Sequence, residues 1–447
     1  MVEKTVLSLS YGRIVVKPPE KLYGLVPESF ETYQIVDPGN IIVRTTDLQN
    51  DQRSLRIGHA KERGIITSAY MCLETTERML HDFGYQYLNA YDLLKIIYGY
   101  GSGLRQNLDF THIRHMPVLV PPRAEQAAIV CYLRYADRRI RHYMRAKQKL
   151  IELLEEQRQA IVDSAITGQI DVRTGRPYPT YRDSGVSWVL SVPQHWEFKK
   201  LKFVKESIPN SFVDGPFGSN LKSEHYVVDG DVYVVESGFI TSGSFVQKEF
   251  KTIAADHFET IKRSECSGGD IVIAKIGARY GMAGILPDLD KPAVVSGNSL
   301  KLTVNAKIVS NRYVHSALLT ARSLGALETI VNATAQPALT LGALNNLALP
   351  MPPLAEQLTI MLAVDRDTSH IDAAIDRARR AISLLREYRI RLIADVVTGK
   401  VDVCEAAVTV PSDVDELDHL EDDSLLADGE ECDEGGEGEV VLEEVQA

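Results

Sequence analysis

The sequence predicts an α+β protein in which two mixed α/β domains are joined by two long helices and followed by a disordered acidic tail. Three observations support this fold class. Residues 121–172 recur as residues 352–403 at a constant offset of 231 positions, without a gap, and both copies carry helical periodicity. Short β-rich runs separated by Pro and Gly precede each copy. From Glu405 onward the chain has 17 Asp and Glu residues and no Lys or Arg.

The bulk composition is that of a globular protein of several domains, with 447 residues, 45% apolar and 25% charged. No apolar run reaches the ~18–20 residues needed to cross a bilayer, and the N-terminus lacks a secretory signal, so we expect a cytoplasmic protein without membrane contact. The five cysteines lie far apart, with no CxxC pair and no His cluster nearby. This spacing argues against a metal site and against a disulfide framework.

The net charge of −12 comes from the tail. Without the 17 acidic tail residues, 44 Asp and Glu face 49 Lys and Arg, so the rest of the chain carries about +5. A mildly basic body is a weak indication of a polyanionic partner. We expect the tail, residues 404–447, to be disordered. It could aid solubility, or it could cover a basic face of the body until a ligand arrives.

The first predicted domain spans residues 1–120. Pro and Gly turns separate its predicted strands, which are Gly12–Val16, Gln34–Val36, Asn40–Arg44 and Ile65–Leu73. A basic segment, residues 53–63, precedes the last of them. Tyr85–Tyr100 has apolar residues at helical spacing and predicts a helix whose aromatic side chains lie mostly in the core.

The first copy of the repeat, residues 121–172, predicts a helix from Pro122 to Ile166. Pro is tolerated in the first turn, Glu125 suits the positive end of the helix dipole, and Gly168 predicts the C-cap. The apolar residues of both copies recur in alternating steps of three and four, which is typical of a heptad seam. The seam residues that we expect to pair the helices include Leu133, Ile140, Leu150, Leu154, Ile161, Ile371, Leu385 and Leu392.

A helix of this length needs a partner helix. At ~1.5 Å per residue it would be roughly 65–70 Å long, too long to bury its apolar stripe on one small domain. The second copy, residues 352–403, has an alanine-rich seam that could accommodate the large residues of the first. We expect the helices to pair within one chain, with pairing between two chains as the alternative.

A linker, residues 173–182, leads to the second predicted domain, residues 183–351, with strands at Val232–Val235 and Asp270–Ile276. The glycine-rich loop Asp214–Lys222 could cradle a phosphate through backbone N–H groups, or it could be an ordinary hairpin turn. The two domains share a faint outline, because Gly39–Arg44 resembles Gly269–Lys275.

Catalytic motifs are missing from the sequence. It contains no Walker A loop, no GxGxxG after a strand and no Asn-Pro-Pro-aromatic loop of the adenine methyltransferases, and its His residues are not at ligand spacing. We therefore expect a protein that is not an enzyme. Two different domains held apart by paired helices of equal length would touch a ligand at two points of fixed spacing, and duplex DNA is such a ligand.

Several longer motifs carry a family resemblance. They are PPxxEQ at the start of each long helix, TG-[QK]-[IV]-DV at its end, DSGVSW…VPQHWEFKKLKFV at the start of the second domain, and GPFGSNLK, GDIVIAKIGARYG and AQPAL within it. In these motifs the chain resembles the DNA-specificity subunits of type I restriction–modification systems over nearly all of residues 1–403. The DSGVSW motif has no counterpart before the first domain, so we expect that domain to lack its N-terminal segment.

The resemblance implies that the two domains are target-recognition domains, each reading one half of a split sequence in double-stranded DNA. The helices would form an antiparallel coiled coil that spaces the domains, and its seam residues would dock the methylation subunits, expected to be two, in a complex that also holds restriction subunits. S-Adenosylmethionine, ATP and Mg are expected on those partner subunits and no cofactor in this chain. The alternative is a coiled-coil adaptor that joins protein partners without reading DNA.

Contacts to bases and phosphates come mainly from Arg, Lys, Asn and Gln side chains and from nearby positive charge. In the second domain we expect them from Ser219, Asn220, Lys222, Lys275, Arg279 and Tyr280. In the first domain we expect them from Arg44, Arg53, Arg56, Lys61 and Arg63. For each of these residues, ordinary solvated surface charge is the alternative.

Overall fold

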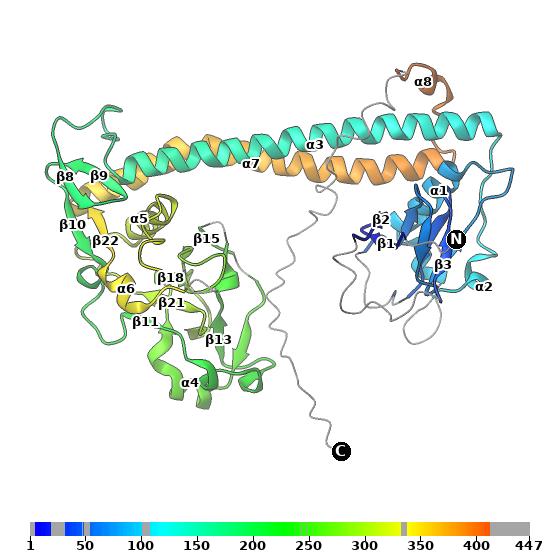
Figure 1. The fold of residues 1–447 in the computed structure, drawn as a ribbon. Coiled ribbons are helices and arrows are strands. Elements are labelled where there is room, and N and C mark those ends of the chain that lie inside the picture. Colours follow the sequence, from blue (N-terminus) through cyan, green and yellow to red (C-terminus); the bar gives the residue numbers. More distant parts are fainter. Residues whose placement is uncertain are drawn as a thin grey trace. The chain divides into compact units, whose positions relative to one another are not determined.

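The computed structural model (Figure 1) describes residues 5–18, 32–46, 48, 54–100, 108–241, 243–246, 248–331 and 338–411. The chain divides into two compact units. Among the described residues, the first unit holds those up to Ile151 and again from Arg377, and the second holds Glu152–Asp376. Within the described ranges, neither the long helices nor any shorter one has the length and apolar character of a membrane span.

The repeated segments form two helices of 44 residues each, α3 (Arg123–Ile166) and α7 (Leu354–Val397), which confirms the predicted long helices. Each begins directly after a Pro-Pro pair. Each is followed by a glycine in the left-handed backbone region, Gly168 at φ +72° and Gly399 at φ +73°. Glycine adopts this conformation without the steric clash of a Cβ, so both helices end at the same type of C-cap.

Ion pairs within each unit show that α3 and α7 run antiparallel. In the first unit Arg389 pairs with Asp137. In the second unit Nε of Arg158 lies 2.7 Å from Oδ1 of Asp372. The earlier residue of α3 therefore meets the later residue of α7. The expected antiparallel pairing of the two helices within one chain is confirmed.

An apolar residue is buried at every eleventh position along both helices. The set consists of Ile129, Ile140, Ile151 and Val162 in α3 and Ile360, Ile371, Ile382 and Ile393 in α7, each at most 8% exposed. A second row with the same spacing contains Leu133 and Met144 in α3 and Val364 and Ile375 in α7, all buried. Eleven residues in three turns give about 3.67 residues per turn, whereas a heptad seam needs 3.5.

The predicted heptad seam is wrong beyond Ile140. It placed Leu150 in the interface, but Leu150 is 41% exposed and its neighbour Ile151 is 5% exposed. The other predicted positions that miss the buried rows are only half-buried, namely Leu154, Ile161, Leu385 and Leu392. A period of about 3.67 moves the seam forward by one residue in roughly six turns relative to a period of 3.5, and this explains the shift.

The domain in front of α3 consists of short strands and small helices. The strands are β1 (Leu7–Ser10), β2 (Arg13–Val16), β3 (Gln34–Val36), β4 (Ile41–Arg44), β5 (Ile57–His59), β6 (Gly64–Ile66) and β7 (Tyr70–Leu73). β1 pairs with β2 and β3 with β6, while β4 is central in the sheet β5-β4-β7. The single strand predicted over Ile65–Leu73 is wrong, because a turn at Ser68 and Ala69 separates β6 from β7.

The helix predicted over Tyr85–Tyr100 begins earlier and is interrupted. α1 spans His81–Leu93, and the 3-10 helix η2 spans Ile96–Tyr100. Lys95, between them, has a φ of +58°, a left-handed conformation that does not continue an α-helix. A short helix, α2 (Phe110–Ile113), follows before α3 begins.

The domain in front of α7 is larger. Its strands are β8 (Tyr181–Val186), β9 (Val189–Pro193), β10 (Glu197–Lys200), β11 (Phe212–Asp214), β12 (Tyr226–Val227), β13 (Val232–Val235), β14 (Ile240–Thr241), β15 (Ser244–Phe245), β16 (Lys251–Ile253), β17 (Glu265–Cys266), β18 (Ile271–Ala274), β19 (Ala283–Ile285), β20 (Ala293–Val295), β21 (Ser299–Leu302) and β22 (Ala348–Met351). Its helices are η3 (Leu201–Phe203), η4 (Gly218–Asn220), η5 (Ser223–His225), η6 (Ser237–Phe239), α4 (Ala255–Ile261), η7 (Lys262–Ser264), α5 (Asn311–Ser323) and α6 (Leu341–Asn346). The main sheets have the strand orders β11-β21-β18-β19 and β12-β16-β13-β20-β17.

The two domains share a common frame that the sequence indicated only faintly. In the first, Ile42 of β4 lies opposite Cys72 of β7 and Gly58 of β5. In the second, Val272 of β18 lies opposite Lys301 of β21 and Gly284 of β19. The sheets β5-β4-β7 and β19-β18-β21 therefore have the same order and register. The helices α1 and α5, of 13 residues each, follow these sheets in the two domains.

The Gln of each PPxxEQ motif joins a long helix to the domain in front of it. Oε1 of the buried Gln126 accepts the backbone N–H of Leu80, the N-cap of α1, at 2.7 Å. Oε1 of the buried Gln357 accepts the N–H of Ser310, the N-cap of α5, at 2.9 Å. Each side-chain amide also donates to the carbonyl of the first proline of its own motif, at 2.7 and 2.9 Å. A buried amide that is satisfied in this way fixes the helix start against the domain.

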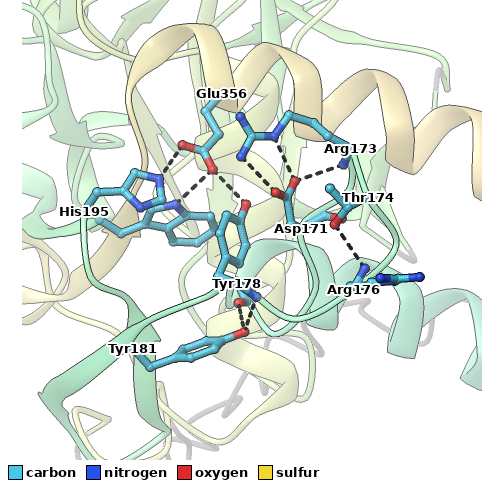
Figure 2. A network of polar contacts seen from close by, with 10 residues as sticks. Asp171, Arg173, Thr174, Arg176, Tyr178, Tyr181, His195 and Glu356 are labelled. Carbon is cyan, nitrogen blue, oxygen red and sulfur yellow. Dashed lines mark hydrogen bonds and ion pairs between the residues drawn. The ribbon is translucent and has the colours of Figure 1, made fainter.

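Glu356 of the second motif holds the linker that follows α3, as Figure 2 shows. Its carboxylate accepts the hydroxyl of Tyr178 at 2.7 Å and Nε1–H of Trp196 at 3.2 Å, and lies 2.8 Å from Nε2 of His195. Burial and the bond to Glu356 raise the pKa of the Tyr178 phenol well above its usual range. These three contacts of Glu356, called the Glu356 strap below, fix the linker and the residues around Trp196 to the first turn of α7.

The equivalent residue of α3 lacks this strap. The carboxylate of Glu125 forms no hydrogen bond or ion pair with any residue that the structure describes.

After the long helices the two halves stay alike for one turn. The side chain of Asp171 accepts the N–H of Arg173 at 3.0 Å, and the side chain of Asp402 accepts the N–H of Cys404 at 2.9 Å. Beyond this turn they diverge.

The tail predicted to be disordered from residue 404 begins with a short helix, α8 (Cys404–Val408), so the prediction is wrong for its first residues. Asp402 accepts the N–H of Cys404 at 2.9 Å, and alanines, which favour helices, follow. The acidic residues from 412 to 447 lie outside the described residues.

The eleven-residue seam can be tested at two adjacent residues. We expect Ile151→Ala to lower the free energy of unfolding by about 2–4 kcal/mol, because it opens a cavity between the helices. Leu150→Ala should change it by only about 0.5 kcal/mol, since that residue is 41% exposed and lies outside the buried rows. Urea unfolding followed by circular dichroism measures both. A larger loss for Leu150→Ala would support the heptad seam instead.

The repeat also supplies a matched control for the Glu356 strap. We expect Glu356→Gln to destabilise the second unit by about 1–3 kcal/mol, because the charge-assisted bonds weaken. Glu125→Gln, at the equivalent position, should have little effect. Both tryptophans of the chain, Trp188 and Trp196, lie in the second unit, so tryptophan fluorescence during urea unfolding reports on it. Equal effects of the two substitutions would mean that the strap does not stabilise this unit.

Candidate nucleic-acid interface

The glycine-rich loop of the second domain follows β11 and is pressed against the turn between β20 and β21. The N–H of Gly215 donates to the carbonyl of Ser299 at 3.0 Å. A Cβ on Gly215 would lie 1.9 Å from the carbonyl oxygen of Ser296, so only glycine fits at this position. The loop is therefore a rigid, anchored element rather than a free hairpin tip.

Asp214 at the start of this loop holds two cations. Its Oδ1 accepts Nη2 of Arg263 at 2.6 Å, and its Oδ2 lies 3.5 Å from Nζ of Lys275. The carboxylate is 11% exposed and the Lys275 side chain 12%, whereas the Arg263 side chain is 58% exposed. Lys275 therefore positions the loop, and Arg263 offers the accessible charge.

The next turn of the loop presents polar groups to solvent. Asn220 and Lys222 are exposed, and the side chain of Ser219 is outside the described part. Nδ1 of His225 accepts the N–H of Lys222 at 3.0 Å, and Nε2 of His257 lies 2.9 Å from the carbonyl oxygen of Asn220. The two imidazole rings stack with centroids 3.9 Å apart and so brace this turn from α4 and η5.

Arg279 and Tyr280 lie in the loop that follows β18, and both are half-buried. Tyr280 packs against the core of the domain, and its carbonyl accepts Nε of Arg322 at 3.0 Å. The structure thus brings Lys275, Arg279 and Tyr280 onto one β18–β19 connection, and Lys275, its first residue, anchors the Asp214 loop. In the AQPAL motif, residues 335–337 lie outside the described residues.

In the first domain, the expected cations occupy different environments. Lys61 is exposed, and Nη1 of the exposed Arg63 lies 2.7 Å from Oδ1 of Asp37. Arg44 ends β4 and is half-buried. Arg53 lies outside the described residues. Of this set, Lys61 and Arg63 are therefore the cations that the structure places on the surface.

Arg56 is a core residue, and the expectation that it contacts DNA is wrong for this structure. It is 0% exposed, its Nε donates to the hydroxyl of Tyr98 at 2.9 Å, and its Nη1 donates to the carbonyl of Thr46 at 2.6 Å. The carboxylate of Asp92 accepts the backbone N–H of Arg56, and burial raises the pKa of that acid. A guanidinium enclosed in this way cannot reach a phosphate.

Sequence reasoning missed three residues at the glycine-rich loop of the second domain, two within it and one, Arg263, in η7. Asp214 looked like part of a turn, and Arg263 lies 49 positions away from it along the chain. Phe217 is 64% exposed, with its ring centroid 4.6 Å from Nζ of Lys275. The signal for Phe217 was its place between two glycines in GPFG, where a large apolar residue is unusual. No local signal links Asp214 to Arg263.

The surface combines anchored backbone, exposed amide and ammonium groups, and an exposed aromatic ring, which suits it to phosphates and base edges. Among the residues that the structure describes, no group of His, Cys, Asp or Glu could hold a metal ion. The exposed groups of this surface therefore support a binding role.

Comparisons with known proteins agree with this fold. Residues 194–373 match a family model described as the type I restriction modification DNA specificity domain. The chain is 22% identical over 351 residues to the type I restriction enzyme MjaVIII specificity subunit of Methanocaldococcus jannaschii, covering 76% of this chain and 75% of that protein. It is 19% identical over 312 residues to the type I restriction enzyme EcoBI specificity subunit of Escherichia coli, covering 68% and 64%.

A solved chain, from work on complex assembly and conformational transition of the type I R-M system, has a TM-score of 0.57 to this structure at 14% identity. The match covers 84% of this chain and 85% of that one. The family model thus identifies a type I restriction modification DNA specificity domain over residues 194–373, the two relatives are similar along most of this chain, and the solved chain shows the same fold.

Proposed function

We propose that this chain gives a type I restriction–modification complex its DNA specificity by reading a two-part sequence in duplex DNA. The observation that carries the proposal is the repeated frame. Two domains with the same central sheet register each meet one of two equivalent 44-residue helices through a buried Gln. One such half reads one half-site, and the antiparallel helix pair sets the spacing between the half-sites.

Within each domain, the proposed contacts divide by exposure. Asn220, Lys222 and Arg263 are the accessible polar and charged groups of the second domain, and Lys61 and Arg63 are those of the first. Their positive charges would contact phosphates, and Asn220 can both donate to and accept from a base edge. Lys275 and Asp214 shape the loop.

The same helices dock the partner subunits in this proposal. The half-buried or exposed apolar residues outside the buried rows, Leu150, Leu154, Ile161 and Leu385, would contact the methylation subunits, whereas Leu392 packs against the core of the first unit. Two equivalent helix surfaces would suit two copies of that subunit. S-Adenosylmethionine, ATP and Mg belong to the methylation and restriction subunits, and this chain contributes binding and not catalysis.

Selection from a random duplex library tests the proposed function. The full chain, combined with the methylation subunits of its system, should enrich sequences with two short conserved blocks separated by a gap of fixed length. Affinity for the enriched duplex should fall steeply with salt, because phosphate contacts release counterions. Enrichment of no sequence, or of one uninterrupted block, would contradict the proposal. An adaptor that binds only proteins would give the first of these results.

Lengthening both helices tests the spacer. Duplicating residues 140–161 in α3 and 371–392 in α7 adds 22 residues to each and preserves the eleven-residue period. At ~1.5 Å per residue this adds about 33 Å, close to one turn of B-DNA. Selection should then return the same two blocks with a gap longer by about ten base pairs.

An eleven-residue duplication in each helix is the matched control. It adds about 16 Å, or half a turn of DNA, so the second half-site would face away from its domain and affinity should drop sharply. Altered half-sites, or an unchanged gap after the 22-residue duplication, would show that the helices do not set the spacing.

A further inference from the structure

We propose that Phe217 makes an apolar contact with a nucleobase in the half-site read by the second domain. This inference rests on the proposed function and names a specificity-determining residue that was not among those expected from the sequence. The ring is 64% exposed, although burying an aromatic side chain is strongly favourable. In a loop that is otherwise tightly anchored, such exposure points to a ligand that covers the ring.

The backbone around Phe217 is fixed before any ligand arrives. On one side, the close approach of Gly215 to Ser296 leaves no room for a Cβ. On the other side, the carbonyl of Phe217 accepts the N–H of Asn220 at 2.9 Å, and His257 braces the same turn. A ring displayed on a rigid loop loses little conformational freedom when it binds, which favours affinity and specificity.

The ammonium group of Lys275 covers part of the Phe217 ring. Nζ of Lys275 lies 4.6 Å from the ring centroid, and Asp214 holds that ammonium at 3.5 Å. A cation held over the ring in this way is attracted to its face. The 64% exposure leaves the rest of the ring to solvent.

The surrounding charges favour DNA as the ligand. The side chain of Arg263, which pairs with Asp214, is 58% exposed. The side chain of Lys222, at the end of the glycine-rich loop, is 54% exposed. Lys222 lies on the same loop as the exposed ring, and Arg263 of η7 is joined to that loop through Asp214; accessible cations beside an aromatic ring match a ligand with anionic phosphates and flat bases. In duplex DNA an aromatic ring can pack against the methyl group of thymine or enter a deformable base step as a wedge, and both contacts depend on the sequence.

Phe203 offers a close control on the same domain. It is 63% exposed, and Nζ of Lys202 lies 5.2 Å from its ring centroid. That lysine donates to the side-chain carbonyl of Asn346 at 3.4 Å and is not held by a buried acid. Phe203 ends η3, outside the glycine-rich loop. The two residues therefore match in type, exposure and nearby charge, and differ in the loop that carries them.

The experiment compares Phe217→Ala, Phe203→Ala and the unaltered chain, each full-length and combined with the methylation subunits. The probe is the duplex enriched from the random library, with a shuffled duplex as the non-specific competitor. We expect Phe217→Ala to weaken specific binding roughly ten-fold or more, and to leave non-specific binding and the salt dependence unchanged, because no phosphate contact is lost. Phe203→Ala should bind like the unaltered chain. Circular dichroism verifies that both variants keep their fold.

The inference is overturned if Phe217→Ala keeps the affinity and selectivity of the unaltered chain, or if Phe203→Ala loses as much. A loss that is equal for specific and shuffled duplexes also overturns it, since a base contact would affect the specific duplex alone. Failure of the unaltered chain to select any sequence is a separate result. It would contradict the proposed function itself and is seen before any variant is made.

Discussion

Burial of an apolar side chain at every eleventh position of two equivalent helices is the constraint on which the rest of the structure depends. The rows lie at the same positions of both copies, so the antiparallel pairs within the two units are built from equivalent parts. Isoleucine at all four positions in α7 and at three of four in α3 gives a stiff, β-branched seam with few rotamers. Such a seam fixes which residues meet and therefore where each helix begins relative to its neighbour.

The buried Gln of each PPxxEQ motif fixes the start of a long helix against the domain in front of it. Because Gln126 and Gln357 accept the N-cap N–H of α1 and of α5, the domain cannot rotate about the helix start without exposing an unpaired polar group. A second layer of polar contacts then fixes the surface loops. Asp214 pairs with both Lys275 and Arg263, but the Lys275 side chain is buried and the Arg263 side chain is 58% exposed, so Arg263 is the cation of this group that a ligand can reach.

Much of the architecture was predictable from the sequence, because a gapless repeat, two Pro-Pro starts and two C-cap glycines are local signals. The register of the seam was not, since periods of 3.5 and 3.67 differ by one residue only after about six turns. The interior position of Arg56 could not be foreseen, because a basic segment looks alike whether or not its partners enclose it. In the second domain, Met282 occupies the equivalent place, since its carbonyl accepts the N–H of Ala274 as that of Arg56 accepts the N–H of Arg44. The pairing of Asp214 with Arg263 depends on tertiary contacts across 49 positions and leaves no pattern in the sequence.

The buried Gln joints have an evolutionary consequence. Each joint lies wholly within one half of the chain and involves only a helix start, its two prolines and one N-cap. A different domain that offers the same N-cap geometry could therefore replace either target-recognition domain without any change to the buried rows of the long helices. Under the proposed function, a gene of this kind would acquire a new target by exchanging one domain through recombination in the repeated segments. Base-by-base adjustment of a loop would not be needed.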